Sequence, residues 1–211
     1  MNKNNTLNYI KTENFVASKK LGQNFLVNVD IKKKIVKSAN IQENDFVVEI
    51  GPGLGSITEI ILQQKKINLL AIELDKRLYE FLSNKFKDYN NFRLINNDVL
   101  NVKLDELIKQ KFIVIANLPY SISSKIIANF CFSENIRYAI IMVQKEMAQR
   151  ICAKPNSKNY NGFSAWLSLC INIEFLFDVG PQNFIPAPKV VSTVVKINFD
   201  NKYTKNQLLE Y

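Results

Sequence analysis

Short apolar runs alternate with helix-like segments along most of this 211-residue chain. The runs are mostly continuous in apolar residues, as expected of parallel strands that are buried on both faces of a sheet. Alternation of such strands with helices predicts an α/β fold with a doubly wound, mostly parallel sheet. The predicted strands are Phe46–Ile50, Asn68–Glu73, Phe92–Asn96, Phe112–Ala116 and Tyr138–Val143.

The pattern changes after residue 151, where the chain no longer alternates in this way. Residues 153–162 are polar and loop-like, and residues 174–179 and 191–199 are strand-like. A proline-stiffened loop over residues 181–189 separates the last two runs. We therefore expect these two runs to form an antiparallel hairpin at the edge of the sheet.

Composition places the chain among ordinary globular proteins of one domain. Residues 1–18 are polar and are expected to form a flexible N-terminal arm ahead of one domain over residues 19–200. No uncharged apolar run approaches the length of a membrane span, so we expect no membrane partner. Three widely spaced cysteines are typical of reduced thiols, which favours a cytoplasmic location. The three cysteines match no metal-ligand spacing, and the chain has no histidine, so no metal is expected.

The formal net charge of +9 indicates a polyanionic partner, most often a nucleic acid. An alternative is that the abundance of Lys and Asn reflects the base composition of the genome. The absence of histidine also excludes catalysis by a histidine base or a serine–histidine pair. An enzyme of this composition has to work through orientation, carboxylates, amides or a reactive cofactor.

A glycine-rich turn, Glu49–Gly55, follows the first predicted strand and precedes a helix. In that context the glycines allow a ligand to approach the backbone closely. Glu73 ends the second strand, where a carboxylate can accept bonds from ribose hydroxyls, and Asp98 follows the third, where it can accept an adenine amine. No phosphate-binding lysine loop is present, so S-adenosylmethionine fits better than NAD or ATP. Each acid alone could instead be a solvated or helix-capping carboxylate.

The motif Asn117-Leu118-Pro119-Tyr120 ends the fourth predicted strand. It combines an amide side chain, a carbonyl before a proline, a rigid turn and an aromatic ring. Asn117 and the Leu118 carbonyl can accept both N–H bonds of adenine N6, while Tyr120 stacks on the base. Such a site predicts methyl transfer to an amino group by proximity, orientation and electrostatics. The structural alternative is a proline turn with a capping asparagine.

Phe184 lies in the proline-stiffened loop. An aromatic ring on a rigid loop is a suitable second stacking surface for a flipped base. The composition of the loop equally allows Phe184 to be a core residue.

Several motifs together resemble those of the ribosomal RNA adenine N6-dimethyltransferases, in the same order and spacing. The resemblance runs from about residue 19 to about residue 199 and is closest to the branch that dimethylates two adjacent adenines near the 3′ end of small-subunit rRNA. Lys154–Lys158, Tyr160 and Leu118 favour that branch. The shared motifs are Leu21–Leu26, Glu49–Gly55, Asn117–Tyr120, Val143–Ala148 and Phe184–Ser192.

The resemblance implies a Rossmann-like methyltransferase sheet, S-adenosylmethionine as cofactor, small-subunit rRNA as partner and a monomeric enzyme. It also implies that Leu21–Leu26 closes over the cofactor. The implied catalytic residues are Asn117, Leu118, Pro119, Tyr120 and Phe184. The implied cofactor-binding residues are Asn24, Leu26, Gly51, Glu73, Asp98 and Asn117.

Two departures from the family pattern concern RNA placement. Tyr160–Ser164 has an extra residue and lacks the basic residue that often follows the glycine. Members usually continue into a helical C-terminal domain, so residues 201–211 are interpreted as the start of a truncated helical region. The remaining alternatives are a large-subunit methyltransferase of the macrolide-resistance type, a non-catalytic RNA-binding assembly factor and a small-molecule methyltransferase.

Overall fold

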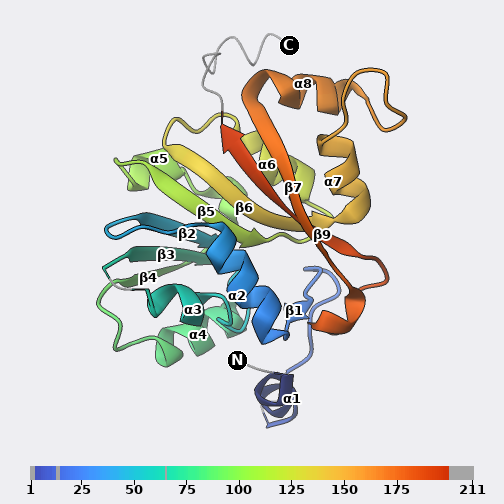
Figure 1. The fold of residues 1–211 in the computed structure, drawn as a ribbon. Helices are drawn as coiled ribbons and strands as arrows, with labels where there is room; N and C mark the ends of the chain where they lie inside the picture. Colours follow the sequence, from blue (N-terminus) through green and yellow to red (C-terminus); the bar gives the residue numbers. More distant parts are fainter. Residues whose placement is uncertain (1–2, 13–14, 65, 200–211) are drawn as a thin grey trace.

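A central sheet of seven strands organises the chain in a computed structural model that describes residues 3–12, 15–64 and 66–199 (Figure 1). The strand order is β4-β3-β2-β5-β6-β9-β7. The predicted tail at 201–211 lies outside the described residues. The strands of this sheet are β2 (Phe46–Ile50), β3 (Asn68–Glu73), β4 (Phe92–Asn96), β5 (Phe112–Asn117), β6 (Ile136–Gln144), β7 (Ile171–Val179) and β9 (Ser192–Phe199).

The first five of these strands in the chain are parallel, which confirms the doubly wound sheet predicted from the sequence. Val48 at the centre of β2 pairs with Leu70 of β3 on one side and with Val114 of β5 on the other. β9 runs antiparallel between β6 and β7, which confirms the antiparallel edge. β7 begins at Ile171, three residues earlier than the strand expected at 174.

Alternating strand residues divide the core into two layers, because successive side chains of a strand point to opposite faces. Val47 and Leu69 pack with α2, α3 and α4 on one face. Val48 and Leu70 pack with α5, α6, α7 and α8 on the other. The helices are α2 (Val29–Ser38), α3 (Thr58–Leu62), α4 (Lys76–Lys85), α5 (Leu104–Leu107), α6 (Ser123–Phe130), α7 (Lys145–Ile151) and α8 (Gly162–Cys170), with short 3-10 turns η1 (Val99–Asn101) and η2 (Pro181–Asn183).

A helix lies within the segment expected to be a flexible arm, residues 1–18. Helix α1 (Lys3–Thr12) forms, and Phe15 beyond it is buried. The Tyr9 ring lies 4.4 Å from that of Phe81 on α4, and the Phe15 ring lies 5.9 Å from that of Phe25. These few aromatic residues in a polar segment supply the apolar surface that docks it on the domain.

A second, two-stranded sheet joins segments that are far apart in the sequence. β1 (Phe25–Leu26) pairs antiparallel with β8 (Phe184–Ile185), with Leu26 opposite Phe184. Two residues are too few to give a periodic signal, so the sequence did not predict this pairing. The pairing brings the loop at 21–26 beside the proline-stiffened loop.

The described helices include none that is both long enough and apolar enough to cross a membrane.

Candidate active site

A pocket opens at the carboxyl ends of β2, β3 and β5, where parallel α/β sheets usually bind their ligands. The loop at 21–26 forms one side of it, and the Asn117–Tyr120 turn forms another. Nine of the ten site residues predicted from the sequence line this pocket: Asn24, Leu26, Gly51, Glu73, Asp98, Asn117, Leu118, Pro119 and Tyr120.

The glycine turn bends back over the end of β3. Gly51 and Gly53 adopt φ angles of 65° and 61°, a left-handed conformation that glycine adopts without strain. The Gly53 amide donates a hydrogen bond of 3.0 Å to Glu73 Oε2. A Cβ at Gly53 would lie 3.2 Å from the Phe25 ring, so the turn and the loop at 21–26 are in close contact.

Glu73 is held in place by the backbone on both carboxylate oxygens. Its Oε1 accepts the Asp75 amide at 2.9 Å, while Oε2 accepts Gly53. Burial of the side chain, which is 5% exposed, raises the Glu73 pKa to about 7, although the two backbone bonds oppose the shift. Each oxygen keeps a further lone pair with which it can accept a ligand hydroxyl.

Glu49 is a second buried carboxyl beside the pocket. Thr58 Oγ1 donates to its Oε2 at 2.6 Å. Burial raises the Glu49 pKa to about 7, and the nearby Glu73 adds to the shift. Together with Asp98, these two residues give the pocket wall an acidic character, and none of its lining residues is Lys or Arg.

Asp98 lies half-buried after β4 and begins η1. Its Oδ1 accepts the Leu100 amide at 2.9 Å. Asp98 therefore caps a short turn and also lines the pocket, so the capping alternative and the site prediction are compatible.

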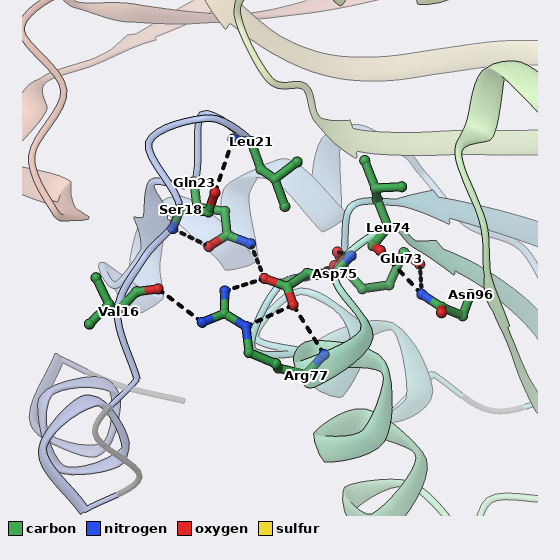
Figure 2. A network of polar contacts seen from close by, with 10 residues as sticks. Val16, Ser18, Leu21, Gln23, Glu73, Leu74, Asp75, Arg77 and Asn96 are labelled. Atoms are coloured by element: carbon green, nitrogen blue, oxygen red, sulfur yellow. Dashed lines mark hydrogen bonds and ion pairs between the residues drawn. The ribbon is translucent and has the colours of Figure 1, made fainter.

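A polar network fastens the loop at 21–26 to the turn after Glu73 (Figure 2). Gln23 Nε2 donates to Asp75 Oδ2 at 2.8 Å, and the Ser18 amide donates to Gln23 Oε1 at 2.7 Å. Arg77 Nη2 lies 2.6 Å from the same Asp75 oxygen, and Nη1 donates to the Val16 carbonyl. The Arg77 bond is the main reason that the Asp75 pKa is lowered.

Sequence reasoning missed Gln23, Asp75 and Arg77. Gln23 lies within the motif Leu21–Leu26 and Asp75 follows Glu73 closely, but nothing in the sequence joined them. Their contacts connect the predicted closing loop to the carboxylate predicted to bind ribose.

Asn117 ends β5 and connects the two sides of the pocket. Its Nδ2 donates to the Asn24 carbonyl at 3.2 Å. That bond uses the amide nitrogen, so the amide oxygen is the group that Asn117 can offer to a ligand donor. Leu118 has a buried side chain, and its backbone amide donates to the Met142 carbonyl at 3.1 Å, which fixes the turn to β6.

Phe184 is the one predicted site residue that the structure does not bring to the pocket. Its side chain is 3% exposed and belongs to the core cluster that contains Met142, Val179 and Val194. The geometry agrees with the core alternative. Stacking of Phe184 on a base would require this ring to leave the core and stays a prediction.

The described residues contain no cluster of three or more His, Cys, Asp or Glu side chains suited to hold a metal ion.

The sheet and its pocket define a Rossmann-like methyltransferase. A family model described as ribosomal RNA adenine dimethylase matches residues 14–211. The chain therefore belongs to the ribosomal RNA adenine dimethylase family.

Relatives and solved structures agree with this assignment. A "Ribosomal RNA small subunit methyltransferase A" of Ureaplasma parvum is 50% identical over 98% of this chain and 77% of its own length. One of Malacoplasma penetrans is 49% identical over 94% of this chain and 71% of its own. A Plasmodium falciparum dimethyladenosine transferase is 29% identical, with a TM-score of 0.74, over 83% of this chain and 63% of that one. The 23S rRNA methyltransferase ErmE, 23% identical with a TM-score of 0.76 over 89% of this chain and 75% of that one, shares the fold.

The residues present fit S-adenosylmethionine, on which this class of enzyme depends. Glu73 has lone pairs that would suit ribose hydroxyls, and Asp98 has a carboxylate that would suit an adenine amine. The acidic wall without a basic side chain suits a sulfonium cation and disfavours a pyrophosphate.

Proposed function

We propose that the chain transfers methyl groups to N6 of two adjacent adenines near the 3′ end of small-subunit rRNA. One observation carries the proposal: a single pocket contains both the acidic residues suited to the cofactor and the Asn117–Tyr120 turn suited to an adenine. The preference for the small subunit is supported by relatives of that name at about half identity. A monomer in the cytoplasm is the form we expect.

Orientation by this chain's own residues accounts for the chemistry. Adenine N6 is a weak nucleophile because its lone pair is delocalised into the ring. The Asn117 side-chain oxygen and the Leu118 carbonyl accept its two N–H bonds, which favours tetrahedral nitrogen and directs the lone pair into the pocket. Tyr120 stacks on the base. Bound S-adenosylmethionine supplies an electrophilic methyl group.

A tritium methyl-transfer assay on unmethylated small ribosomal subunits tests the proposal, with mapping of the labelled nucleotides. Label in two adjacent adenines near the 3′ end is the expected result. Label only in naked large-subunit rRNA would favour the resistance-type alternative. Cofactor binding without label in either RNA would favour the non-catalytic assembly factor.

Cofactor affinity should decrease as pH falls from 7.5 to 5.5. Ionised Glu73 and Glu49 favour a cationic ligand, and their raised pKa values of about 7 mean that they become protonated in this range. Each carboxyl that must lose its proton contributes up to about tenfold in affinity per pH unit below its pKa. Calorimetry at several pH values measures the effect, and Glu73→Gln should reduce the slope. An unchanged slope in that variant would remove Glu73 from the linkage.

Stability of the free protein should have the opposite pH dependence. Both carboxyls bind their protons more tightly in the folded chain than at the ordinary value of 4.5. Their contribution to stability is therefore present at low pH and is lost as pH rises from about 4.5 to about 7.

RNA binding should weaken steeply as salt rises, because the net charge is +9 and Lys19 and Lys20 are exposed next to the loop at 21–26. Replacing both lysines by alanine should reduce the slope of log affinity against log salt by about 2. The matched control is Lys87→Ala with Lys109→Ala, which removes the same charge from exposed positions elsewhere. Filter binding of small-subunit rRNA measures the slopes. Equal slopes in the two double variants would place the RNA on another surface.

A further inference from the structure

A buried serine anchors the ring of Tyr120. The hydroxyl oxygens of Tyr120 and Ser192 lie 2.7 Å apart, which is the usual length of a hydrogen bond between two hydroxyls. Ser192 is 0% exposed, and Tyr120 is partly buried at the pocket. The residues are 72 positions apart in the sequence, so only the fold brings them together.

Ser192 itself has little freedom to move. It is the first residue of β9, where it is paired with Gln144 of β6 on one side and with Val179 of β7 on the other. The Lys145 amide also donates to the Val191 carbonyl at 2.9 Å. Strands on both sides therefore fix the backbone that carries this hydroxyl.

A second polar contact secures the neighbouring residue. Thr193 Oγ1, also in a fully buried residue, donates to Asp178 Oδ1 at 2.6 Å. Asp178 Oδ2 in turn pairs with Lys145 Nζ at 2.6 Å. These bonds clamp the ends of β6, β7 and β9 together directly beside Ser192.

The ring of Tyr120 is restrained from both ends. Ser123 Oγ donates to the Tyr120 carbonyl at 3.2 Å, and Pro119 precedes it in the turn. Two side-chain torsions set the plane of a tyrosine ring once its backbone is fixed. A hydrogen bond on the hydroxyl restrains these torsions further. Burial raises the Tyr120 pKa, although the bond to Ser192 opposes the shift.

We propose that Ser192 is a positioning residue that fixes the plane of the Tyr120 ring for stacking on the target adenine. The inference rests on the proposed function for the role of Tyr120. Because the Tyr120 ring is already held in position, its side chain loses no conformational freedom when the base enters. We therefore expect the hydrogen bond to raise kcat. Cofactor binding does not depend on it, because Ser192 is not among the pocket-lining residues.

A double-mutant cycle on methyl transfer tests the link. Ser192→Ala and Tyr120→Phe should each lower kcat about tenfold, the effect of one net hydrogen bond, with little change in KM for small ribosomal subunits. The double variant should be no slower than either single variant, because the same bond is lost. Ser192→Thr keeps the hydroxyl and should recover most of the rate.

A matched control separates positioning from general loss of stability. Ser133→Ala removes a hydroxyl that also makes a 2.7 Å hydrogen bond, in this case to Asp105. Ser133 precedes the first residue of β6 and therefore lies at the end of the sheet opposite the pocket. It should lower the melting temperature without lowering kcat. Cofactor affinity by calorimetry should be unchanged in Ser192→Ala.

A measurement that needs no activity keeps the two proposals distinct. The carbon NMR signal of the Tyr120 ring carbon bonded to the hydroxyl, assigned with Tyr120→Phe, should shift in Ser192→Ala and stay in place in Ser133→Ala. An unmoved signal, or additive losses in the double variant, would overturn the role of Ser192. If the signal shifts in Ser192→Ala but the wild-type protein methylates no rRNA, the proposed function is overturned and the anchoring of the Tyr120 ring by Ser192 stands.

Discussion

Replacing Asn117 by alanine is expected to lower the rate of methyl transfer by about 10²–10³. The interaction of its amide oxygen with adenine N6 strengthens as the nitrogen becomes tetrahedral, so its loss falls mainly on the transition state. Single-turnover methylation of small ribosomal subunits measures the rate. Affinity for S-adenosylmethionine should fall much less, although the lost 3.2 Å bond to the Asn24 carbonyl loosens the loop at 21–26.

Asn129→Ala is a suitable control, because Asn129 is an exposed residue of the neighbouring helix α6. It should leave both the rate and the affinity close to those of the wild type. An Asn117→Ala protein that binds the cofactor and still methylates at nearly the wild-type rate would rule the mechanism out. The fold would stand, and Asn117–Tyr120 would then be a structural turn.

Replacing Glu73 by alanine is expected to weaken the binding of S-adenosylmethionine by about 1.5–3 kcal/mol. The variant loses the acceptor for the ribose hydroxyls. It also leaves the Gly53 and Asp75 amides without the carboxylate that holds them, so the glycine turn is no longer fixed at the end of β3. Isothermal titration calorimetry measures the loss of affinity, and thermal unfolding of the free protein measures the loss of structure.

Two further variants distinguish the loss of cofactor affinity from the loss of stability. Glu73→Gln keeps the shape and part of the hydrogen bonding, so it should retain more stability than Glu73→Ala while still losing affinity. Glu80→Ala removes an exposed carboxylate from α4 and should change neither quantity. Full affinity in Glu73→Ala would show that the ribose lies elsewhere in the pocket.

The sheet and half of the pocket could be predicted because their signals are local. Buried parallel strands such as Phe46–Ile50 are apolar runs, and runs of this kind alternate with helices in the sequence. Parallel strands also place their carboxyl ends at one edge, so Gly51, Glu73, Asp98 and Asn117 were expected to meet there, and all four line the pocket. The antiparallel edge followed from the change of pattern after residue 151.

The helix and the aromatic contacts within the segment expected to be a flexible arm were not predicted, because composition describes a whole segment and packing depends on a few residues. Tyr9 and Phe15 of the polar N-terminal segment contact the rings of Phe81 and Phe25. The place of Phe184 was undecided for a similar reason. A ring in a proline-stiffened loop can face a ligand or the core, and its neighbours in space decide which; here these are core residues.

The sequence by itself determined the kind of sheet, the edge that carries the site and the residue types available there, because each depends on neighbours within a few positions. The tertiary structure decided the contacts between distant segments. Gln23 reaches Asp75, β1 pairs with β8, and Ser192 meets Tyr120. These contacts have no sequence period, since they arise only where the folded sheet places chain segments side by side and buried polar groups pair with one another.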